Sequence, residues 1–281
     1  MGGITTLPNW WHHLPEYINP NIIEIGSFHI RYYSLMYIIA FAVVYLLVLF
    51  RLNNEKLEYS REIIQRFLAW CFLGVVLGGR LGHVLYEFRY YAANPFEIFL
   101  PFDFSNGLHF TGYSGMSFHG GLIGVILVTI VFCSRNKINI WRFADLFSPA
   151  VPLGYTFGRL GNFINGELYG RITNVPWGMY SQLDPARQLR HPSQLYEALG
   201  EGIILFIILW SLRKVKYFDG FLFSLYLIGY GVFRFFIEFA RQPDRLALGP
   251  FTMGQIFCAG MALTGIFIVL IKAVNIKGKE Q

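Results

Sequence analysis

Long apolar stretches alternate with short polar connectors along this chain of 281 residues. A helix that crosses a bilayer needs about 20 predominantly apolar residues. The pattern therefore predicts an all-α polytopic membrane protein, a single integral membrane domain over residues 1–281 with about seven transmembrane helices. The stretches of helical length are residues 31–51, 64–86, 117–134, 143–165, 194–212, 218–240 and 252–272.

The composition indicates lipid as the solvent. Hydrophobic residues make up 54% of the chain and charged residues only 14%, with a mean hydropathy of +0.44. A soluble domain carries about 25% charged residues, so the composition excludes a disordered chain and argues against a soluble enzyme. The first basic residue is Arg31, so we expect no cleavable signal peptide.

Charge and cysteine usage exclude other classes. The formal net charge is +6, but the 23 Lys and Arg residues are scattered in short groups. Nucleic-acid binding needs basic residues clustered on one face, so we expect no nucleic-acid partner. The three cysteines, Cys71, Cys133 and Cys258, lie inside apolar stretches without metal-ligand or redox spacing. We therefore expect neither a metal nor a cofactor.

The connectors give the helices an orientation. Counted over alternate loops, twelve Lys and Arg residues fall on one side and seven on the other. Because basic residues accumulate in cytoplasmic loops, we predict an outside N-terminus and a cytoplasmic C-terminus. Two outside connectors, residues 87–116 and 166–193, are long and are expected to form a small head. Trp10 and Trp11 favour an interfacial N-terminal segment over residues 1–30.

Ionisable residues inside the apolar stretches converge on one depth. Arg80, Arg159 and Arg234 each lie six residues before the outer end of a stretch, which is roughly 9 Å at 1.5 Å per residue. Such residues are costly in a membrane and face a cavity or a partner. Near the same level lie Tyr33, His119, Glu197 and Glu201.

Two interpretations of these arginines stay open. Arg234 and Glu238 are four residues apart on one helical face, so internal ion pairing is one of them. The other is an anionic ligand, since acids at this level look too few to neutralise three arginines and guanidinium groups hold phosphate in a two-pronged geometry. A phospholipid headgroup is the anion found at that depth.

The densest polar cluster is Gly158-Arg159-Leu160-Gly161-Asn162-Phe163-Ile164-Asn165-Gly166-Glu167-Leu168-Tyr169-Gly170-Arg171, at the outer end of the fourth stretch. Arg159 and Asn162 are three apart and face the same side. His119 is either a packed or hydrogen-bonded residue or a proton-transfer group, and the pKa range of histidine suits proton transfer near neutral pH. His191 begins the fifth stretch from outside, where it caps a helix or contacts a headgroup.

Several motifs together resemble the bacterial prolipoprotein diacylglyceryl transferase family. They occur in the family's order between about residues 30 and 255. Beside the cluster that begins at Gly158, they are Tyr32-Tyr33-Ser34-Leu35-Met36-Tyr37, Gly78-Gly79-Arg80, Ser117-Phe118-His119-Gly120-Gly121-Leu122, His191-Pro192-Ser193-Gln194-Leu195-Tyr196-Glu197, Phe233-Arg234 through Glu238, and Arg241-Gln242-Pro243-Asp244.

The resemblance implies a multi-pass enzyme of the bacterial inner membrane whose active site faces the periplasm, so that the outside head is periplasmic. Such an enzyme moves the diacylglyceryl group of phosphatidylglycerol to the lipobox cysteine in the signal peptide of a prolipoprotein. The products are a thioether-linked lipid and glycerol phosphate, in the first step of lipoprotein maturation. The partners implied are phosphatidylglycerol, the prolipoprotein and the lipid bilayer.

The resemblance also assigns residues. Arg159 and Arg234 match the family's essential arginines and His119 its proposed catalytic histidine. The positions that match substrate-binding or sensitive residues of the family are Arg159, Asn162, Glu167, Tyr33, Arg80, Gly170, Glu238 and His191. Ser34 departs from the glycine common in the family, and the connector 87–116 is somewhat long.

The transfer reaction that the resemblance implies needs a base and a positive field, and His119, Arg159 and Arg234 can supply them. A thiolate attacks the glycerol carbon that bears the phosphate, and a free thiol has a pKa of about 8.5. His119 is one candidate for the base, and the positive field of the arginines, which lowers the thiol pKa, is the other. Arg159 and Arg234 stabilise the charge that develops on the leaving phosphate.

Two alternatives come from other classes. Gly112-Tyr113-Ser114-Gly115 matches the Gly-x-Ser-Gly of intramembrane serine proteases, but such an enzyme needs a histidine in a later stretch and the last histidine is His191. A transporter of an anionic solute also has arginines in a cavity. The chain shows no internal repeat, which such transporters often have.

Overall fold

The computed structural model describes residues 8–25, 28–55, 57–98, 102–103, 109–110, 115–242, 246–249 and 251–277. These residues are mostly helical, and contacts divide the chain into two compact units. The first unit comprises residues 1–56 and 144–281, and the second comprises residues 57–143.

The described residues of the first unit form five long or composite helices and a set of short elements. Its elements are α1 (Asn9–His12), α2 (Leu14–Tyr17), β1 (Asn21–Ile25), β2 (Phe28–Arg31), α3 (Tyr32–Glu55), α8 (Val151–Ile164), α9 (Ser193–Glu197), η2 (Ala198–Ile204), α10 (Leu205–Leu212), α11 (Phe221–Ile237), β5 (Leu246–Leu248), β6 (Phe251–Thr252), α12 (Met253–Lys277) and the end of α7 (Ile140–Phe147). The second unit contains α4 (Arg61–Tyr86), α5 (Phe88–Ala93), η1 (Pro95–Ile98), β3 (Phe102–Asp103), β4 (His109–Phe110), α6 (Phe118–Arg135) and the start of α7.

Five helical segments of the described residues are long and apolar enough to cross a membrane. They are Tyr32–Glu55, Arg61–Tyr86, Phe118–Arg135, Ser193–Leu212 and Met253–Val274, and the shorter apolar helix α11 has 17 residues. The prediction of a polytopic membrane protein is therefore confirmed, because the side chains that cover these helices are large, apolar and exposed.

Two details of the predicted fold are wrong. The fourth stretch, residues 143–165, is not one helix: α7 ends at Phe147, a turn occupies residues 148–150, and α8 begins at Val151. Pro149 and Pro152 explain the break, since proline lacks the backbone N–H that continues a helix and is tolerated in a first turn. The chain is also not purely helical, because β1–β2, β3–β4 and β5–β6 form antiparallel pairs.

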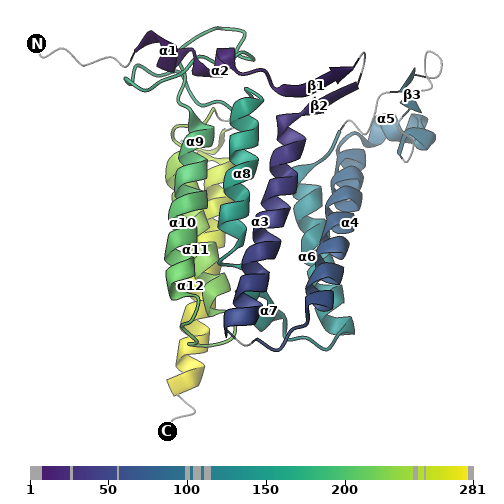
Figure 1. Cartoon of the computed structure of the whole chain (residues 1–281), viewed down its shortest axis with the longest axis vertical. Helices are drawn as coiled ribbons and strands as arrows, with labels where there is room; N and C mark the ends of the chain where they lie inside the picture. The colour runs from purple at the N-terminus through teal and green to yellow at the C-terminus, as the bar shows by residue number, and fades with distance from the viewer. Residues whose placement is uncertain are drawn as a thin grey trace, which may run out of the picture. The chain divides into compact units, whose positions relative to one another are not determined.

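Close helix packing in the first unit depends on small residues. Gly161 of α8 faces α3 so closely that a Cβ there would lie 3.3 Å from Tyr33 and Met36. The pairs α3 with α8 and α11 with α12 make the main helix contacts of this unit. Within it, α1, α2 and the β1–β2 hairpin lie across one end of the helices, and the C-terminal end of α12 lies at the other (Figure 1).

The N-terminal segment packs on the connector 166–193. Nδ1 of His12 lies 2.7 Å from the carbonyl oxygen of Gly178, and the backbone N–H of Tyr180 donates to the carbonyl of His12 at 2.7 Å. The amide of Gln182 donates to the carbonyl of Pro15 at 2.9 Å. These contacts join two segments distant in sequence into one layer at the end of the first unit.

In the second unit, α4 and α6 pack through glycines. Gly78 of α4 lies against the backbone of Gly120 and Gly124 of α6, with no room for a Cβ. This agrees with the close helix crossing that small residues at a four-residue spacing favour. The backbone N–H of Ser117, the N-cap of α6, donates to the carbonyl of Gly79 at 2.9 Å.

Candidate active site

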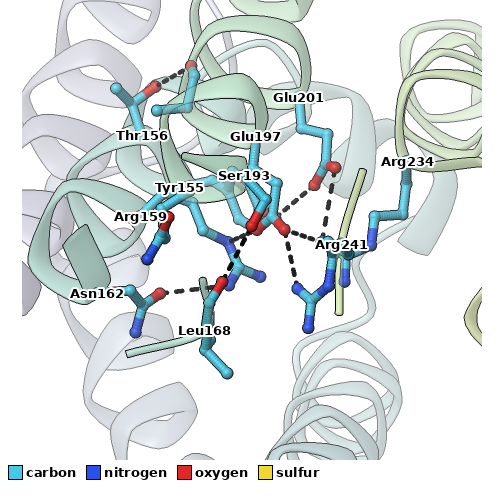
Figure 2. Close-up of polar contacts among 12 residues, drawn as sticks. Tyr155, Thr156, Arg159, Asn162, Leu168, Ser193, Glu197, Glu201, Arg234 and Arg241 are labelled. Atoms are coloured by element: carbon cyan, nitrogen blue, oxygen red, sulfur yellow. Dashed lines mark hydrogen bonds and ion pairs between the residues drawn. The ribbon is translucent and has the colours of Figure 1, made fainter. Parts of the chain in front are cut away.

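One buried carboxylate organises a cluster of arginines in the first unit. Glu197 is fully buried, and its Oε2 lies 2.7 Å from Nε of Arg159. Its Oε1 lies 2.9 Å from Nη1 of Arg234 and 2.8 Å from Nη1 of Arg241. Figure 2 shows Glu197 among these arginines, which come from α8, from α11 and from the residues just after α11. A single side chain of α9 therefore holds three cations from separate parts of the chain.

Two further glutamates complete the cluster. Oε1 of Glu201 lies 3.6 Å from Nη1 of Arg234, and its Oε2 accepts a hydrogen bond from the hydroxyl of Tyr155. Oε2 of Glu238 lies 3.5 Å from Nε of Arg234 and 3.5 Å from Nε of Arg241. These carboxylates are buried. Buried charges require partners, and here three arginines face three glutamates.

Helical spacing explains why the acids converge. Glu197 and Glu201 are four residues apart, so both project from one face of the segment formed by α9 and η2. The segment η2 is a π-helix, a rare form that occurs frequently at functional sites. Arg234 and Glu238 have the same spacing at the end of α11. Helical spacing therefore places the charged side chains on one face of each helix, and the packing of α8, η2 and α11 brings these faces together.

A polar relay extends from Arg159 along the end of α8. Nη1 of Arg159 donates to Oδ1 of Asn162 at 3.2 Å, and Nδ2 of Asn162 donates to Oε1 of Glu167 at 2.8 Å. The ring of Tyr155 lies 4.7 Å from the guanidinium carbon of Arg159. The relay fixes the rotation of the Arg159 guanidinium and joins it to the start of the connector 166–193.

The other predicted residues of the first unit lie around this cluster. Tyr33 shares a hydrogen bond with Tyr37 at 3.0 Å between hydroxyl oxygens and packs beside Gly161. The backbone N–H of Gly170 donates to the carbonyl of His191 at 2.9 Å, so Gly170 pairs with backbone. Burial lowers the pKa of His191, whose Nδ1 lies 3.1 Å from the hydroxyl of Tyr196.

An ion pair braces the connector 166–193. Arg190 donates from Nε and Nη2 to the two carboxylate oxygens of Asp184, each at 2.8 Å, and its guanidinium lies over the ring of Tyr169. The hydrogen bonds from Arg190 hold the pKa of Asp184 below its usual value. Two-pronged pairs of this kind fix a geometry, so the connector has a defined conformation beside the cluster.

Arg80 and His119 belong to the second unit. The guanidinium of Arg80 donates from Nε to the carbonyl of Ile98 at 2.9 Å and from Nη2 to that of Glu97, and it lies over the ring of Tyr91. His119 lies in the first turn of α6, is exposed and contacts the ring of Phe118. Arg80 therefore binds backbone carbonyls at the junction of α4 and η1.

Sequence reasoning missed part of the cluster. The predicted site residues do not include Arg241, Glu197 or Glu201, although all three belong to the cluster. The signal was present, because two glutamates four residues apart in an apolar stretch need buried partners. The expectation that acids are too few at this level is wrong, and internal ion pairing is observed for Arg159 and Arg234.

Comparison with known proteins decides the family. Residues 20–271 match the family described as prolipoprotein diacylglyceryl transferase. The chain belongs to this family. It is similar to phosphatidylglycerol–prolipoprotein diacylglyceryl transferases of Chlorobaculum tepidum, at 52% identity over 93% of this chain and 92% of the relative, and of Campylobacter hominis, at 40% over 97% of each. The relative from Campylobacter jejuni is 42% identical over 95% of this chain and 99% of its own length.

Membership in the prolipoprotein diacylglyceryl transferase family makes this protein a transferase and a multi-pass membrane protein. It does not favour the protease or the transporter. The serine of the protease motif, Ser114, lies outside the described residues, as do Pro243 and Asp244 of the motif that begins at Arg241.

Proposed function

We propose that this protein transfers the diacylglyceryl group of phosphatidylglycerol to the lipobox cysteine in a prolipoprotein signal peptide. In this proposal the protein lies in the bacterial inner membrane and forms one membrane domain with seven spans. Its N-terminus is outside, and its active site faces the periplasm. The observation that carries it is the buried group of Arg159, Arg234 and Arg241 around Glu197, inside a unit whose helices are apolar outside. Ionisable residues inside a membrane unit mark functional sites, and guanidinium groups match the geometry of a phosphate.

The phosphate is proposed to bind between Arg159 and Arg234. Each guanidinium has five N–H donors, more than its contacts within the protein use. In Arg159 the contacts with Glu197 and Asn162 engage Nε and Nη1. Both arginines share one carboxylate, so their separation is set before the lipid enters. Preorganised donors in a water-poor site stabilise developing charge more strongly than donors that must reorient.

The transfer is a substitution at carbon. The thiol loses its proton, the sulfur attacks the glycerol carbon that carries the phosphate, and the C–S bond forms as the C–O bond breaks. The electron pair of that C–O bond passes to the phosphate oxygen, and glycerol phosphate leaves. Arg159 and Arg234 neutralise the leaving group. In this proposal His119 accepts the thiol proton, with the positive field of the arginines favouring the thiolate.

The remaining assigned residues are proposed to shape the substrate site. Asn162 and Glu167 orient Arg159 through the relay at the end of α8. Glu238 holds Arg234 and Arg241. The residues proposed to border the lipid or the signal peptide are Tyr33, Arg80, Gly170 and His191.

The test is transfer by the purified protein in detergent. Phosphatidylglycerol labelled in its acyl chains is incubated with a lipobox peptide, and the expected products are a labelled thioether peptide and one equivalent of glycerol phosphate. A peptide with serine in place of the lipobox cysteine is the control and should take up no label. Absence of label on the cysteine peptide, with the lipid unchanged, would overturn the proposal.

A further inference from the structure

The start of α12 contacts the arginine cluster through a capping motif. Oγ1 of Thr252 accepts a hydrogen bond from the backbone N–H of Gln255 at 3.1 Å, and Oε1 of Gln255 accepts one from the backbone N–H of Thr252 at 3.0 Å. This reciprocal pair is a capping box. Thr252 and Gln255 are both only 2% exposed, so this capping box is buried.

The capping hydroxyl has a second role. While its oxygen accepts from Gln255, the Oγ1–H of Thr252 donates to Oε1 of Glu238 at 3.1 Å. The other oxygen of Glu238 lies between Nε of Arg234 and Nε of Arg241. A carboxylate that accepts from a fixed hydroxyl has a defined rotation, so the cap determines where the charge of Glu238 lies between the two arginines.

A glycine leaves space for this carboxylate. A Cβ on Gly254 would lie 2.7 Å from Oε1 and 2.9 Å from Cδ of Glu238. The obstructing atoms are the far end of a flexible side chain, so a larger residue at position 254 is accommodated by moving the carboxylate away from Thr252. Glu238 also lies at the N-terminal end of a 25-residue helix, where a negative charge is favourable.

We propose that Thr252, Gly254 and Gln255 are positioning residues for the transfer reaction. They hold Glu238, which contacts Arg234 and Arg241, so that Arg234 keeps the position opposite Arg159 that the lipid phosphate needs. This inference rests on the proposed function. Without the cap, Glu238 rotates and draws one arginine with it, so the affinity for phosphatidylglycerol falls while the protein stays folded.

The experiment measures KM for phosphatidylglycerol in mixed micelles and kcat with a lipobox peptide. For Thr252→Val and Gly254→Ala we expect KM to rise about tenfold, the effect of losing one hydrogen bond to a charged group. Thr252→Ser keeps the hydroxyl and should restore a KM close to that of the wild type. A purely structural role would reduce the amount of active enzyme, and thus the apparent kcat, without changing KM.

Two matched controls lie in the same helix. The hydroxyl of Thr264 donates within α12, to the carbonyl of Gly260, and among the described residues a Cβ on Gly260 would meet no atom within 4 Å apart from the backbone of its own helix. Thr264→Val and Gly260→Ala should therefore keep the wild-type KM. An unchanged KM in both Thr252→Val and Gly254→Ala, with wild-type enzyme active, would overturn the inference. Inactive wild-type enzyme would instead contradict the proposed function.

Discussion

Glu197 of α9 and Arg159 of α8 form a buried ion pair with 2.7 Å between Oε2 and Nε. Glu197 has no exposed surface, and Arg159 retains only a small one. Because a lone buried charge is strongly unfavourable, each of these side chains needs an oppositely charged partner in order to be buried. The pair therefore both stabilises the first unit and holds Arg159 in the candidate active site.

Glu197→Gln is expected to destabilise the protein and to abolish transfer. The substitution leaves Arg159, Arg234 and Arg241 without their shared anion, and removal of one partner of a buried ion pair costs about 3–5 kcal/mol. Thermal unfolding in detergent should show a clearly lower Tm. The control is Glu58→Gln, at an exposed position between α3 and α4, which should change neither Tm nor transfer. A Tm equal to that of the wild type would contradict the central role of Glu197.

His119→Gln is expected to reduce transfer about a hundredfold or more, which is a typical contribution of a general base. His119 is exposed at the start of α6, so the substitution should not lower Tm. Binding of phosphatidylglycerol should be mostly kept, because the proposed phosphate ligands are Arg159 and Arg234. Turnover and lipid binding are measured separately on the same preparation. Unchanged turnover removes His119 from the mechanism.

Gly170→Ala is expected to destabilise the connector 166–193 by about 1–3 kcal/mol, the usual cost of overpacking. A Cβ there would meet backbone atoms of His191 and Ala240, which cannot move without disrupting their own hydrogen bonds. Both Tm and transfer should fall. Gly158→Ala is the matched control, since a Cβ at that position would meet no atom of the described residues within 4 Å beyond the backbone of α8. Equal Tm values for the two variants would rule out this steric explanation.

Asp184→Asn is expected to lower the stability of the fold at neutral pH. It should also make that stability change less as the pH falls. The hydrogen bonds from Arg190 lower the pKa of Asp184 in the folded state, whereas an unfolded aspartate has a pKa of about 3.9. The pair therefore stabilises the fold above that pH, and the contribution is lost as pH falls through the folded-state pKa.

The measurement for this pair is Tm between pH 7 and pH 3, chosen to bracket an aspartate pKa of about 3.9. The wild type should lose more stability on acidification than Asp184→Asn does. Glu87→Gln, at an exposed position, should follow the wild-type curve. Parallel curves for the wild type and Asp184→Asn would show that the pair contributes nothing to acid stability.

Local patterns were enough for the membrane class and for part of the site. Apolar stretches of helical length identify helices wherever the chain faces lipid, because lipid requires every backbone group to bond within its own segment. Asn162 follows Arg159 by three residues on one helix, so spacing predicts that they share a side, and the two side chains are in contact. The turn at residues 148–150 was missed because hydropathy does not register Pro149 as a break.

Composition and hydrophobic period alone determine that this chain is helical, lies in lipid and carries arginines where lipid should be, since these properties depend on residues close in sequence. The tertiary structure alone decides that Glu197 serves Arg159, Arg234 and Arg241 together, and that Thr252 reaches Glu238. Ion pairs between residues that are tens of positions apart depend on which helix faces pack. No local pattern in the sequence encodes that choice, because each partner by itself is satisfied equally well by any opposite charge at the right depth.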